Sequence, residues 1–413
     1  MDMLTTGRGD GLRQTGRRFG HRPTVLARLA APAFGRVLDR IDRALISGAL
    51  HARLPDGTRR TLGGRAAGFE CQVDLRSWNA LVRLASSGSV GWYQGWAAGE
   101  WWSPDPVPLF ALFMQHGERL GDTARAKGVF RLALRLAHLA NRNTAEGAQR
   151  NIAAHYDLGN AFYAAWLDPT MSYSSGYRLA DAASLEEGQR RKWERLQERL
   201  GKPDTLLEIG CGWGSLADHF AHAGSAVTAI SLSREQLAWA REHQAQGIDF
   251  RHQDYREVAG QYDAIVSVEM VEALGREYWP VFMDCIARNL KPGGRAALQY
   301  ITIRDDLFDR YTASADFIQA YIFPGGLLIR ASEFRQLAQS RGLQWRDEET
   351  FGLDYAETLK TWRENFDLAF REGRLPATFD ARFCDLWQYY LMYCEGGFRG
   401  GGIDVCQVTL VKE

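Results

Sequence analysis

A glycine-rich turn carries the clearest chemistry in this sequence. The apolar run Leu206-Leu207 ends at Glu208, and glycines then occupy positions 210, 212 and 214. Glycine lets a backbone turn tightly and approach a ligand without a Cβ clash, and a helix that follows offers its N-terminus to that ligand. The turn therefore predicts a nucleotide-type cofactor, although NAD sites and S-adenosylmethionine (AdoMet) sites share this spacing.

The ends of the neighbouring strands separate these two cofactors. The second strand ends in Ser231-Leu232-Ser233, without the acid that would hold the ribose of a nicotinamide cofactor. The third ends in Gln253-Asp254, which suits hydrogen bonds to an adenine edge, and the fourth ends in the acidic stretch Val268-Glu269-Met270-Val271-Glu272. This order of features, with a Lys291–Gly294 turn before the next strand, resembles class I AdoMet methyltransferases and fits dinucleotide enzymes poorly.

Alternating strands and helices must position these strand ends. The apolar patterns predict strands over Thr205–Ile209, Ala226–Ser231, Phe250–His252, Tyr262–Val268, Arg295–Ile303 and Val405–Val411. They predict helices over Ser184–Leu200, Ser215–Ala223, Arg234–Gln244, Tyr278–Asn289, Ala356–Phe370 and Ala381–Cys394. This alternation predicts an α/β, doubly wound, Rossmann-like methyltransferase domain over residues 151–413.

A smaller α+β domain is predicted over residues 23–122. Its signs are a helix over Val25–Leu50, a hairpin turn at Leu54–Gly57, strands around Ala66–Val73, and helices around Trp78–Ser86 and Pro108–His116. Within it, Gly95–Trp102 is dense in tryptophan beside glycine. A packed core is the first interpretation of that segment, and the lining of an apolar groove is the alternative.

Two basic segments flank this smaller domain. Residues 1–22 are rich in Gly, Arg and Thr and are predicted to form a disordered basic arm, which either meets an anionic membrane surface or is simply solvated. Residues 123–150 are predicted to form a basic amphipathic linker helix, and lying on a membrane is the alternative.

Composition restricts the class of protein. The 413 residues contain 50 Lys+Arg and 50 Asp+Glu, so net charge argues neither for nor against an anionic partner. The six cysteines form no CxxC pair, so we expect no metal site and no disulfide framework. No stretch approaches the ~18 apolar residues of a spanning helix. We therefore expect a cytoplasmic protein, peripheral at the inner membrane face if lipid is involved, with no nucleic-acid partner.

Motifs in and around the larger domain narrow the family. The segments are Asn151–Asn160, Phe162-Tyr163, Met171–Ser175, Gln253–Arg256, Tyr321–Gly326, Tyr389–Leu391, Cys394 and Gly397–Arg399. Together they resemble cyclopropane-fatty-acyl-phospholipid synthases and mycolic acid cyclopropane synthases. The N-terminal part, with Gly88–Gly91 and Gly95-Trp96, resembles the small lipid-binding domain of the enzymes that act on phospholipid bilayers. Family members that act at membranes are often dimers, so the resemblance leaves a homodimer as an alternative to a monomer.

The resemblance implies methyl transfer from AdoMet to the double bond of an unsaturated acyl chain, followed by closure of a cyclopropane ring. The same transfer giving a methyl- or methylene-branched chain without ring closure is the alternative. A methyltransferase of another small molecule and a non-enzymatic lipid-binding protein are the further alternatives.

The resemblance also assigns roles to individual residues. AdoMet contacts are implied for Tyr173, Ser174, Glu208, Gly210, Cys211, Gly212, Trp213, Gly214, Ser231, Leu232, Gln236, Gln253 and Asp254.

The family's general base is a bicarbonate ion held by a Cys, a Glu, a His and a Tyr, and this chain departs from that set. Glu272 and Tyr321 match the Glu and the Tyr, whereas Ser175 and Gln299 stand at the Cys and His positions. Cys394 matches a further functional cysteine, with a small buried hydrophobe as the alternative. Ser175 and Gln299 still donate hydrogen bonds to an anion. If no bicarbonate binds, Glu272, a water that it activates or a differently placed base would take the proton.

Overall fold

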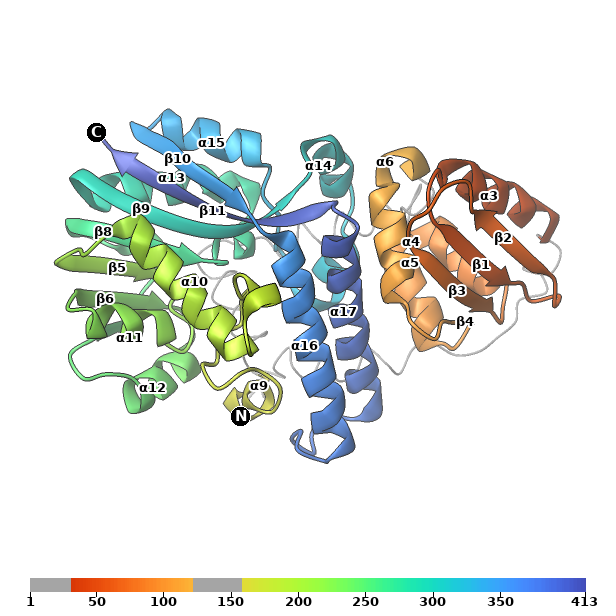
Figure 1. The fold of residues 1–413 in the computed structure, drawn as a ribbon, viewed down its shortest axis with the longest axis horizontal. Helices are drawn as coiled ribbons and strands as arrows, with labels where there is room; N and C mark the ends of the chain where they lie inside the picture. The colour runs from red at the N-terminus through yellow and green to blue at the C-terminus, as the bar shows by residue number, and fades with distance from the viewer. Residues whose placement is uncertain (1–30, 122–157) are drawn as a thin grey trace, which may run out of the picture. The chain divides into compact units, whose positions relative to one another are not determined.

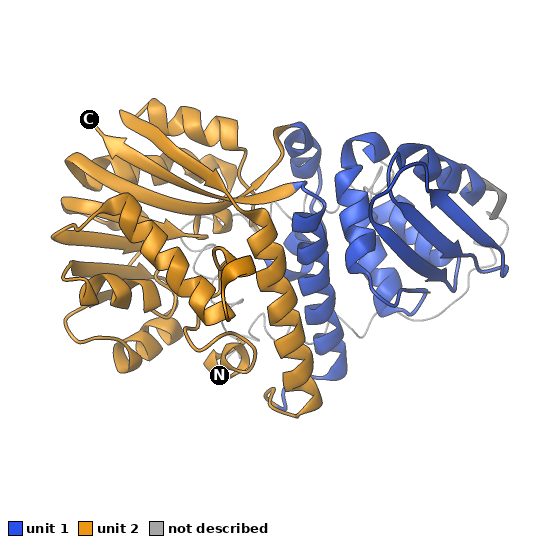
Figure 2. Cartoon of the chain, viewed as in Figure 1, with its two compact units in different colours: residues 1–140, 306–324, 377–402 blue, residues 141–305, 325–376, 403–413 orange. Residues whose placement is uncertain are grey.

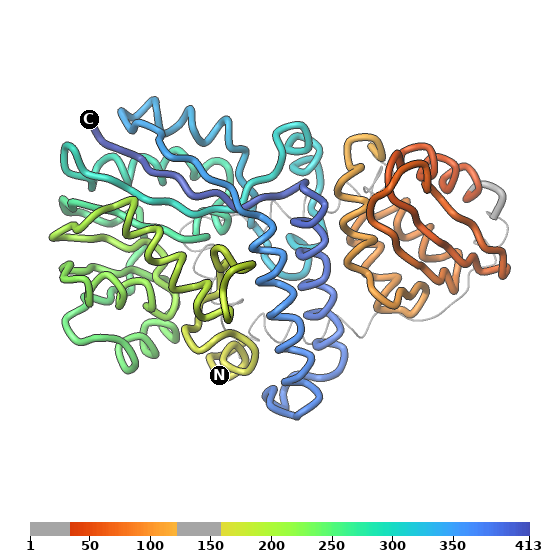
Figure 3. Tube along the Cα trace, in the orientation of Figure 1, coloured from red at the N-terminus to blue at the C-terminus, as the bar shows by residue number. Residues whose placement is uncertain are grey.

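The computed structural model describes residues 31–121 and 158–413, which divide into two compact units (Figure 2). Unit 1 comprises residues 1–140, 306–324 and 377–402, and unit 2 comprises residues 141–305, 325–376 and 403–413. Each unit thus takes three separate segments of the chain, which can be followed by colour in Figure 3. The predicted arm over residues 1–22 and the predicted linker helix over residues 123–150 lie outside the described residues, and the predicted domain boundaries remain a prediction.

Unit 2 is built on a seven-stranded sheet with the order β10-β11-β9-β8-β5-β6-β7 (Figure 1). The strands are β5 (Thr205–Ile209), β6 (Ala226–Ser231), β7 (Asp249–His252), β8 (Tyr262–Val268), β9 (Leu290–Ile303), β10 (Leu343–Thr350) and β11 (Ile403–Lys412). β9, β8, β5, β6 and β7 pair in parallel, whereas β11 runs antiparallel between β9 and β10. The predicted α/β Rossmann-like fold is confirmed.

Helices cover both faces of this sheet. They are α9 (Asn160–Ala164), α10 (Leu185–Leu200), α11 (Ser215–His222), α12 (Arg234–His243), α13 (Trp279–Asn289), α15 (Ala331–Gln339) and α16 (Gly352–Arg371). One core joins Leu196 of α10, Phe220 of α11 and Leu237 of α12 to the strand side chains on one face. On β9, Tyr300 packs against Phe334 of α15 with ring centroids 5.1 Å apart. This packing fixes the strand ends from which the loops emerge.

Unit 1 contains a four-stranded sheet with the order β2-β1-β3-β4. Its elements are β1 (Ala49–Arg53), β2 (Arg59–Gly63), β3 (Glu70–Leu75), β4 (Trp101–Trp102), α3 (Ala31–Ala44), α4 (Asn79–Ala97), α5 (Val107–Gln115), α6 (Gly117–Leu120), most of α14 (Asp305–Thr312), the π-turn η7 (Ile318–Ile322) and α17 (Ala381–Arg399). β1 and β2 form the hairpin predicted at Leu54–Gly57, and Leu54 N donates to Thr58 O at 2.8 Å. The helix predicted to reach Leu50 was too long, because α3 ends at Ala44 and β1 begins at Ala49.

The aromatic segment of unit 1 lies largely in its core. Trp101 is 1% exposed, stacks on Trp92 with centroids 4.3 Å apart and donates its indole N–H to Trp92 O at 2.8 Å. Trp102 next to it is 44% exposed. The core interpretation is therefore confirmed for Trp101 and not for its neighbour.

Among the described helices, none has both the length and the apolar character needed to cross a bilayer.

Candidate active site

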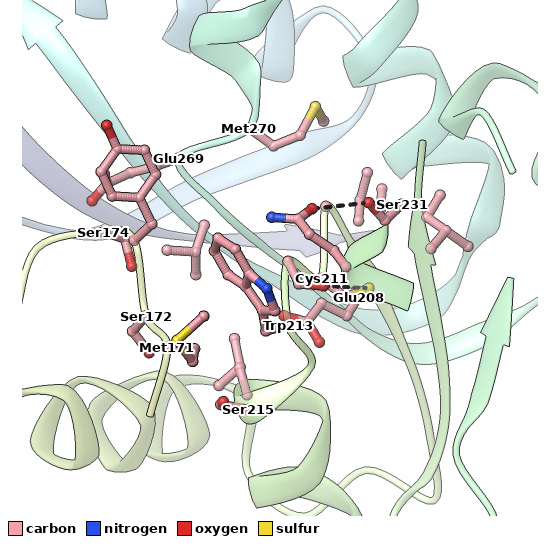
Figure 4. Close-up of a pocket in the computed structure, with 18 of the residues that line it drawn as sticks. Met171, Ser172, Ser174, Glu208, Cys211, Trp213, Ser215, Ser231, Glu269 and Met270 are labelled. Carbon is pink, nitrogen blue, oxygen red and sulfur yellow. Dashed lines mark hydrogen bonds between the residues drawn. The ribbon is translucent and has the colours of Figure 1, made fainter. Parts of the chain in front are cut away.

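A pocket opens in unit 2 at the carboxyl ends of β5, β6 and β8, where open α/β sheets bind their ligands (Figure 4). Its lining includes eleven of the residues predicted to contact AdoMet: Tyr173, Ser174, Glu208, Gly210, Cys211, Gly212, Trp213, Ser231, Leu232, Gln236 and Gln253. It also includes residues for which no role was predicted, among them Lys192, Glu269 and Met270. In the view of Figure 4, Glu269 and Ser174 lie together on one side of the pocket and Ser231 on the other.

The glycine turn has the backbone that its spacing predicts. Gly210, Gly212 and Gly214 have φ angles of 87°, 53° and 84°, in the left-handed region that favours glycine. The turn is tied to β6, because the backbone N–H groups of Gly210 and Cys211 both donate to Ile230 O at 3.0 Å. A Cβ at Gly210 would lie 2.7 Å from Cγ of Met270, so the turn also approaches the loop after β8 closely.

Replacing Gly214 by alanine is expected to lower the free energy of unfolding by about 1–3 kcal/mol, because the new Cβ meets both backbone strain and a clash. That Cβ would lie 2.9 Å from ring carbons of Phe250 and 3.1 Å from Cβ of Ala240. Gly212→Ala is the matched control, because it introduces the same left-handed strain with no heavy atom within 4 Å of the new Cβ. Urea denaturation without cofactor measures both variants, and equal losses would remove the clash from the explanation.

Three buried polar atoms of the pocket-lining residues lack a partner among the described residues. They are Oε2 of Glu208, at the end of β5, Nε2 of Gln236, in the first turn of α12, and the hydroxyl oxygen of Tyr255. Burial raises the pKa of Glu208 to about 8. Buried polar atoms are rarely left without hydrogen bonds, so a ligand with hydroxyl donors and a polar acceptor fits here. The ribose hydroxyls of AdoMet are such donors, and the residues present fit this cofactor.

Lys192 brings a buried positive charge to the pocket. Its side chain, on α10, is 1% exposed, and Nζ donates to Ser174 Oγ at 2.6 Å. Burial lowers its pKa to about 8, against the opposing influence of the carboxylates of Glu269, Asp168 and Glu208. Sequence reasoning missed this residue. The sequence pattern does indicate a buried lysine, because Lys192 lies on the apolar face of α10, at helical spacing from Leu185 and Leu196.

Two of the residues predicted to contact AdoMet are not in the pocket lining. Gly214 begins α11 and contributes through its backbone conformation. The carboxylate of Asp254 is engaged by the Arg256 guanidinium, with Nε 2.8 Å from Oδ1, and the Arg256 hydrogen bonds hold its pKa below the usual value. Its direct contact with the cofactor remains a prediction.

Ser175 and Gln299, at the Cys and His positions of the family set, converge on Glu269. The Ser175 backbone N–H donates to Oε1 of Glu269 at 3.0 Å, and the Gln299 side-chain N–H donates to the same oxygen at 2.7 Å. The Tyr355 hydroxyl donates to Oε2 at 2.7 Å. Sequence reasoning noted Glu269 as an acid at a strand end but gave it no role.

The backbone of Glu269 is unusual. Its φ is 50°, where a residue other than glycine costs roughly 1–2 kcal/mol. Such strain persists where the surroundings over-determine it, often at functional sites.

Glu272 lies in the loop after β8 and is held differently. Its Oε1 accepts the backbone N–H of Ile301, its own carbonyl accepts Leu327 N at 2.8 Å, and its Oε2 is buried without a partner among the described residues. Burial, and then the negative charge of Glu269, raise the pKa of Glu272 to about 8. Glu272 therefore keeps its proton at neutral pH.

Tyr321 and Cys394 belong to unit 1 and are described within it. Tyr321 is buried, its ring centroid lies 4.7 Å from that of Tyr93, and its hydroxyl accepts the Gln94 side-chain N–H at 3.2 Å. Burial raises the pKa of the Cys394 thiol well above its usual value, so the thiol is neutral. The structure therefore joins Ser175 and Gln299 through Glu269, while the predicted catalytic roles of Glu272, Tyr321 and Cys394 stay predictions.

The fold, and the glycine-lined pocket at the carboxyl ends of its strands, are those of an AdoMet-dependent methyltransferase. Residues 143–408 match the family model described as mycolic acid cyclopropane synthetase, and the chain belongs to this family.

Individual relatives agree with this assignment. The chain is 37% identical over 360 residues to the tuberculostearic acid methyltransferase UfaA1 of Mycobacterium tuberculosis, covering 80% of this chain and 81% of that protein. It is 35% identical over 367 residues to the cyclopropane-fatty-acyl-phospholipid synthase of Escherichia coli K12, covering 84% and 90%. The crystal structure of the mycolic acid cyclopropane synthase CmaA1 complexed with SAH and CTAB has a TM-score of 0.59 and 27% identity, covering 64% of this chain and 98% of that one.

Proposed function

We propose that this chain transfers the methyl group of AdoMet to the double bond of an unsaturated acyl chain in membrane phospholipid, giving a cyclopropane chain. The observation that carries the proposal is the glycine-lined pocket with the unpartnered Oε2 of Glu208, in a chain 35% identical to a cyclopropane-fatty-acyl-phospholipid synthase along most of its length. Bound AdoMet would supply an electrophilic methyl group. Glu208 would accept hydrogen bonds from the ribose hydroxyls, and the glycine turn would let the backbone lie against the cofactor.

Methyl transfer to an alkene leaves a carbocation on the acyl chain, which the site must stabilise and keep dry. Tyr173 lines the pocket, and its ring centroid lies 5.4 Å from that of Tyr163 and 5.2 Å from that of Trp362. Aromatic faces attract cations, most strongly where water is excluded. This cluster would therefore lower the energy of the cation without offering it a nucleophile.

A branched product is the second candidate, because this chain differs from the family at the positions that hold the base. The donors at Ser175 and Gln299 are engaged by Glu269, and the UfaA1 relative is named a methyltransferase and not a cyclopropane synthase. A base at another position would remove a proton from a carbon of the acyl chain. The product would then be a branched chain, because the proton whose loss closes the ring would stay in place.

Unit 1 is proposed to bring the enzyme to the bilayer as a peripheral protein, alone or as a homodimer. The exposed Trp102 ring lies 5.8 Å from the Arg76 guanidinium, a pairing suited to an interface with one apolar and one anionic side.

The product decides between these candidates. Purified protein is incubated with AdoMet and vesicles of monounsaturated phospholipid, and the released fatty acids are analysed by mass spectrometry. We expect a gain of one CH₂ with loss of the double bond. The same gain with the double bond retained would establish the branched product, and no gain on any acyl chain would refute the lipid substrate.

A further inference from the structure

We propose that the Glu269 carboxylate takes the place of the bicarbonate ion and is itself the general base of this enzyme. This inference rests on the proposed function, because it names the group that removes the proton after methyl transfer. It also means that the donors at Ser175 and Gln299 are not left for the anion implied by the family resemblance.

The donors that would bind the anion are already engaged. Both residues that would replace the family's Cys and His, Ser175 and Gln299, already donate to Oε1 of Glu269. The Ser175 hydroxyl is turned away, because it donates to Gly176 O at 2.7 Å. A bicarbonate ion would have to displace a carboxylate that is covalently part of the protein. The residues present therefore do not fit a bound bicarbonate.

A chain of buried hydrogen bonds fixes the orientation of Gln299. The Arg199 guanidinium, which can only donate, donates from Nε to Oε1 of Gln407 at 3.0 Å. The Gln407 amide N–H must then face away, and it donates to Oε1 of Gln299 at 2.9 Å. Gln299 consequently presents its own N–H group to Glu269. An acceptor is required at that point, and a carboxylate supplies one.

The backbone of Glu269 is strained. The left-handed φ of Glu269 would suit glycine, so a glutamate there is unfavourable unless its side chain is needed in this place. The three donors hold the carboxylate against that strain. Oε2 accepts the Tyr355 hydroxyl at 2.7 Å and keeps a second lone pair, and the residue lines the pocket.

The two acids of the loop after β8, Glu269 and Glu272, have different electrostatic surroundings. Burial raises the pKa of Glu269, whereas Lys192 and the donated hydrogen bonds lower it. Burial and the negative charge of Glu269 both raise the pKa of Glu272, and Glu272 stays protonated. Two neighbouring carboxyl groups with different environments divide into one base and one acid. A base whose pKa is raised toward the working pH accepts a proton more readily.

The step balances without another reagent. The cationic acyl chain loses a proton from a C–H bond to Oε2 of Glu269. The electron pair of that bond forms the new C–C bond of a ring or the C=C bond of a branched chain. The proton then leaves to solvent after product release.

Two variants test this role. Glu269→Gln keeps the size of the side chain and removes the base, and we expect turnover to fall by about 10²–10⁴-fold, with AdoMet affinity unchanged. Glu269→Gly removes the carboxylate, relieves the strain and frees the donors. In buffer depleted of CO₂ it should be equally inactive, and added bicarbonate, formate or acetate should restore its turnover at least tenfold. Wild-type turnover should not respond to these anions. Glu277→Gln, at an exposed glutamate, is the control.

A binding readout separates this inference from the proposed function. Formate should raise the melting temperature of Glu269→Gly and leave that of the wild type unchanged, whatever the acyl substrate is. Wild-type protein that modifies no lipid would refute the proposed function, and the formate shift would still be measurable. Wild-type turnover that depends on bicarbonate, Glu269→Gln turnover within threefold of wild type, or a Glu269→Gly variant that is folded but not rescued would each overturn the role of Glu269.

Discussion

Glu208→Gln is expected to weaken AdoMet binding by about 100-fold or more, with little change in fold. The carboxylate lies at the end of β5, is 3% exposed and has one oxygen without a partner among the described residues. Hydrogen bonds to a charged group contribute ~1.5–3 kcal/mol each, and ~1.4 kcal/mol is tenfold in affinity. Hydroxyl donors of the bound ribose would favour the ionised form of Glu208, and glutamine keeps the size and one acceptor but loses that charge and the second acceptor. Isothermal titration with AdoMet or SAH measures the change.

The control for this variant is Glu198→Gln. Glu198 is 67% exposed, and its carboxylate accepts a hydrogen bond from Arg195, which does not line the pocket. Its affinity should match that of the wild type. The melting temperature of Glu208→Gln without cofactor should not fall, since the substitution replaces a buried carboxyl whose pKa is raised to about 8 by a neutral group of similar shape. An affinity within threefold of wild type would show that Glu208 does not hold the ribose.

The strands that form the centre of the sheet could be predicted closely, and the edge strand could not. β5, β6 and β8 have the predicted bounds, because strands buried on both faces read as apolar runs. β10 was missed, because Leu343–Thr350 is an edge strand whose side chains are mostly polar and of which only Leu343 is buried. Its position depends on pairing with β11, about sixty residues later in the chain, and local pattern does not contain that information.

The same reasoning explains which part of the site was foreseen. The glycine turn and Glu208 lie within seven residues, so their spacing alone indicates a cofactor site. Glu269 acquires its surroundings from Ser175, 94 residues before it, and from Tyr355, 86 residues after it. Gln299 is oriented by Gln407, at a separation of 108 residues. Only the folded sheet brings these donors to one carboxylate.

Lys192→Met is expected to lower the free energy of unfolding by about 3–5 kcal/mol near pH 7, because removing one partner of a buried charge pair leaves the other uncompensated. The lysine is 1% exposed, and the nearby acids Glu269 and Asp168 favour its charged form. Methionine fills a similar volume, so packing is largely kept. Urea denaturation of the cofactor-free protein at several pH values measures the loss.

The pH dependence of the stability loss in Lys192→Met shows whether the removed charge causes it. Without Lys192, the pKa values of the buried acids, already raised by burial for Glu269 and Asp168, should rise further. An acid whose pKa is higher in the folded state than in the unfolded state stabilises the fold at pH values below its unfolded pKa. That stabilisation is lost as the pH rises through the folded pKa. The deficit of the variant should therefore grow from pH 5 to pH 7. Above pH 8 it should shrink, because Lys192 itself, with a pKa of about 8, loses its proton in the folded wild type.

The exposed Lys360 on α16 provides the matched substitution. Lys360→Met removes the same charge from another helix without uncovering a buried carboxylate, so its stability should stay within about 0.5 kcal/mol of wild type at every pH. A Lys192→Met deficit that does not change between pH 5 and pH 7 would attribute the loss to packing. In that case the charge of Lys192 would not be what opposes the rise in the pKa of Glu269 caused by burial, and the Ser175, Gln299 and Tyr355 donors alone would oppose it.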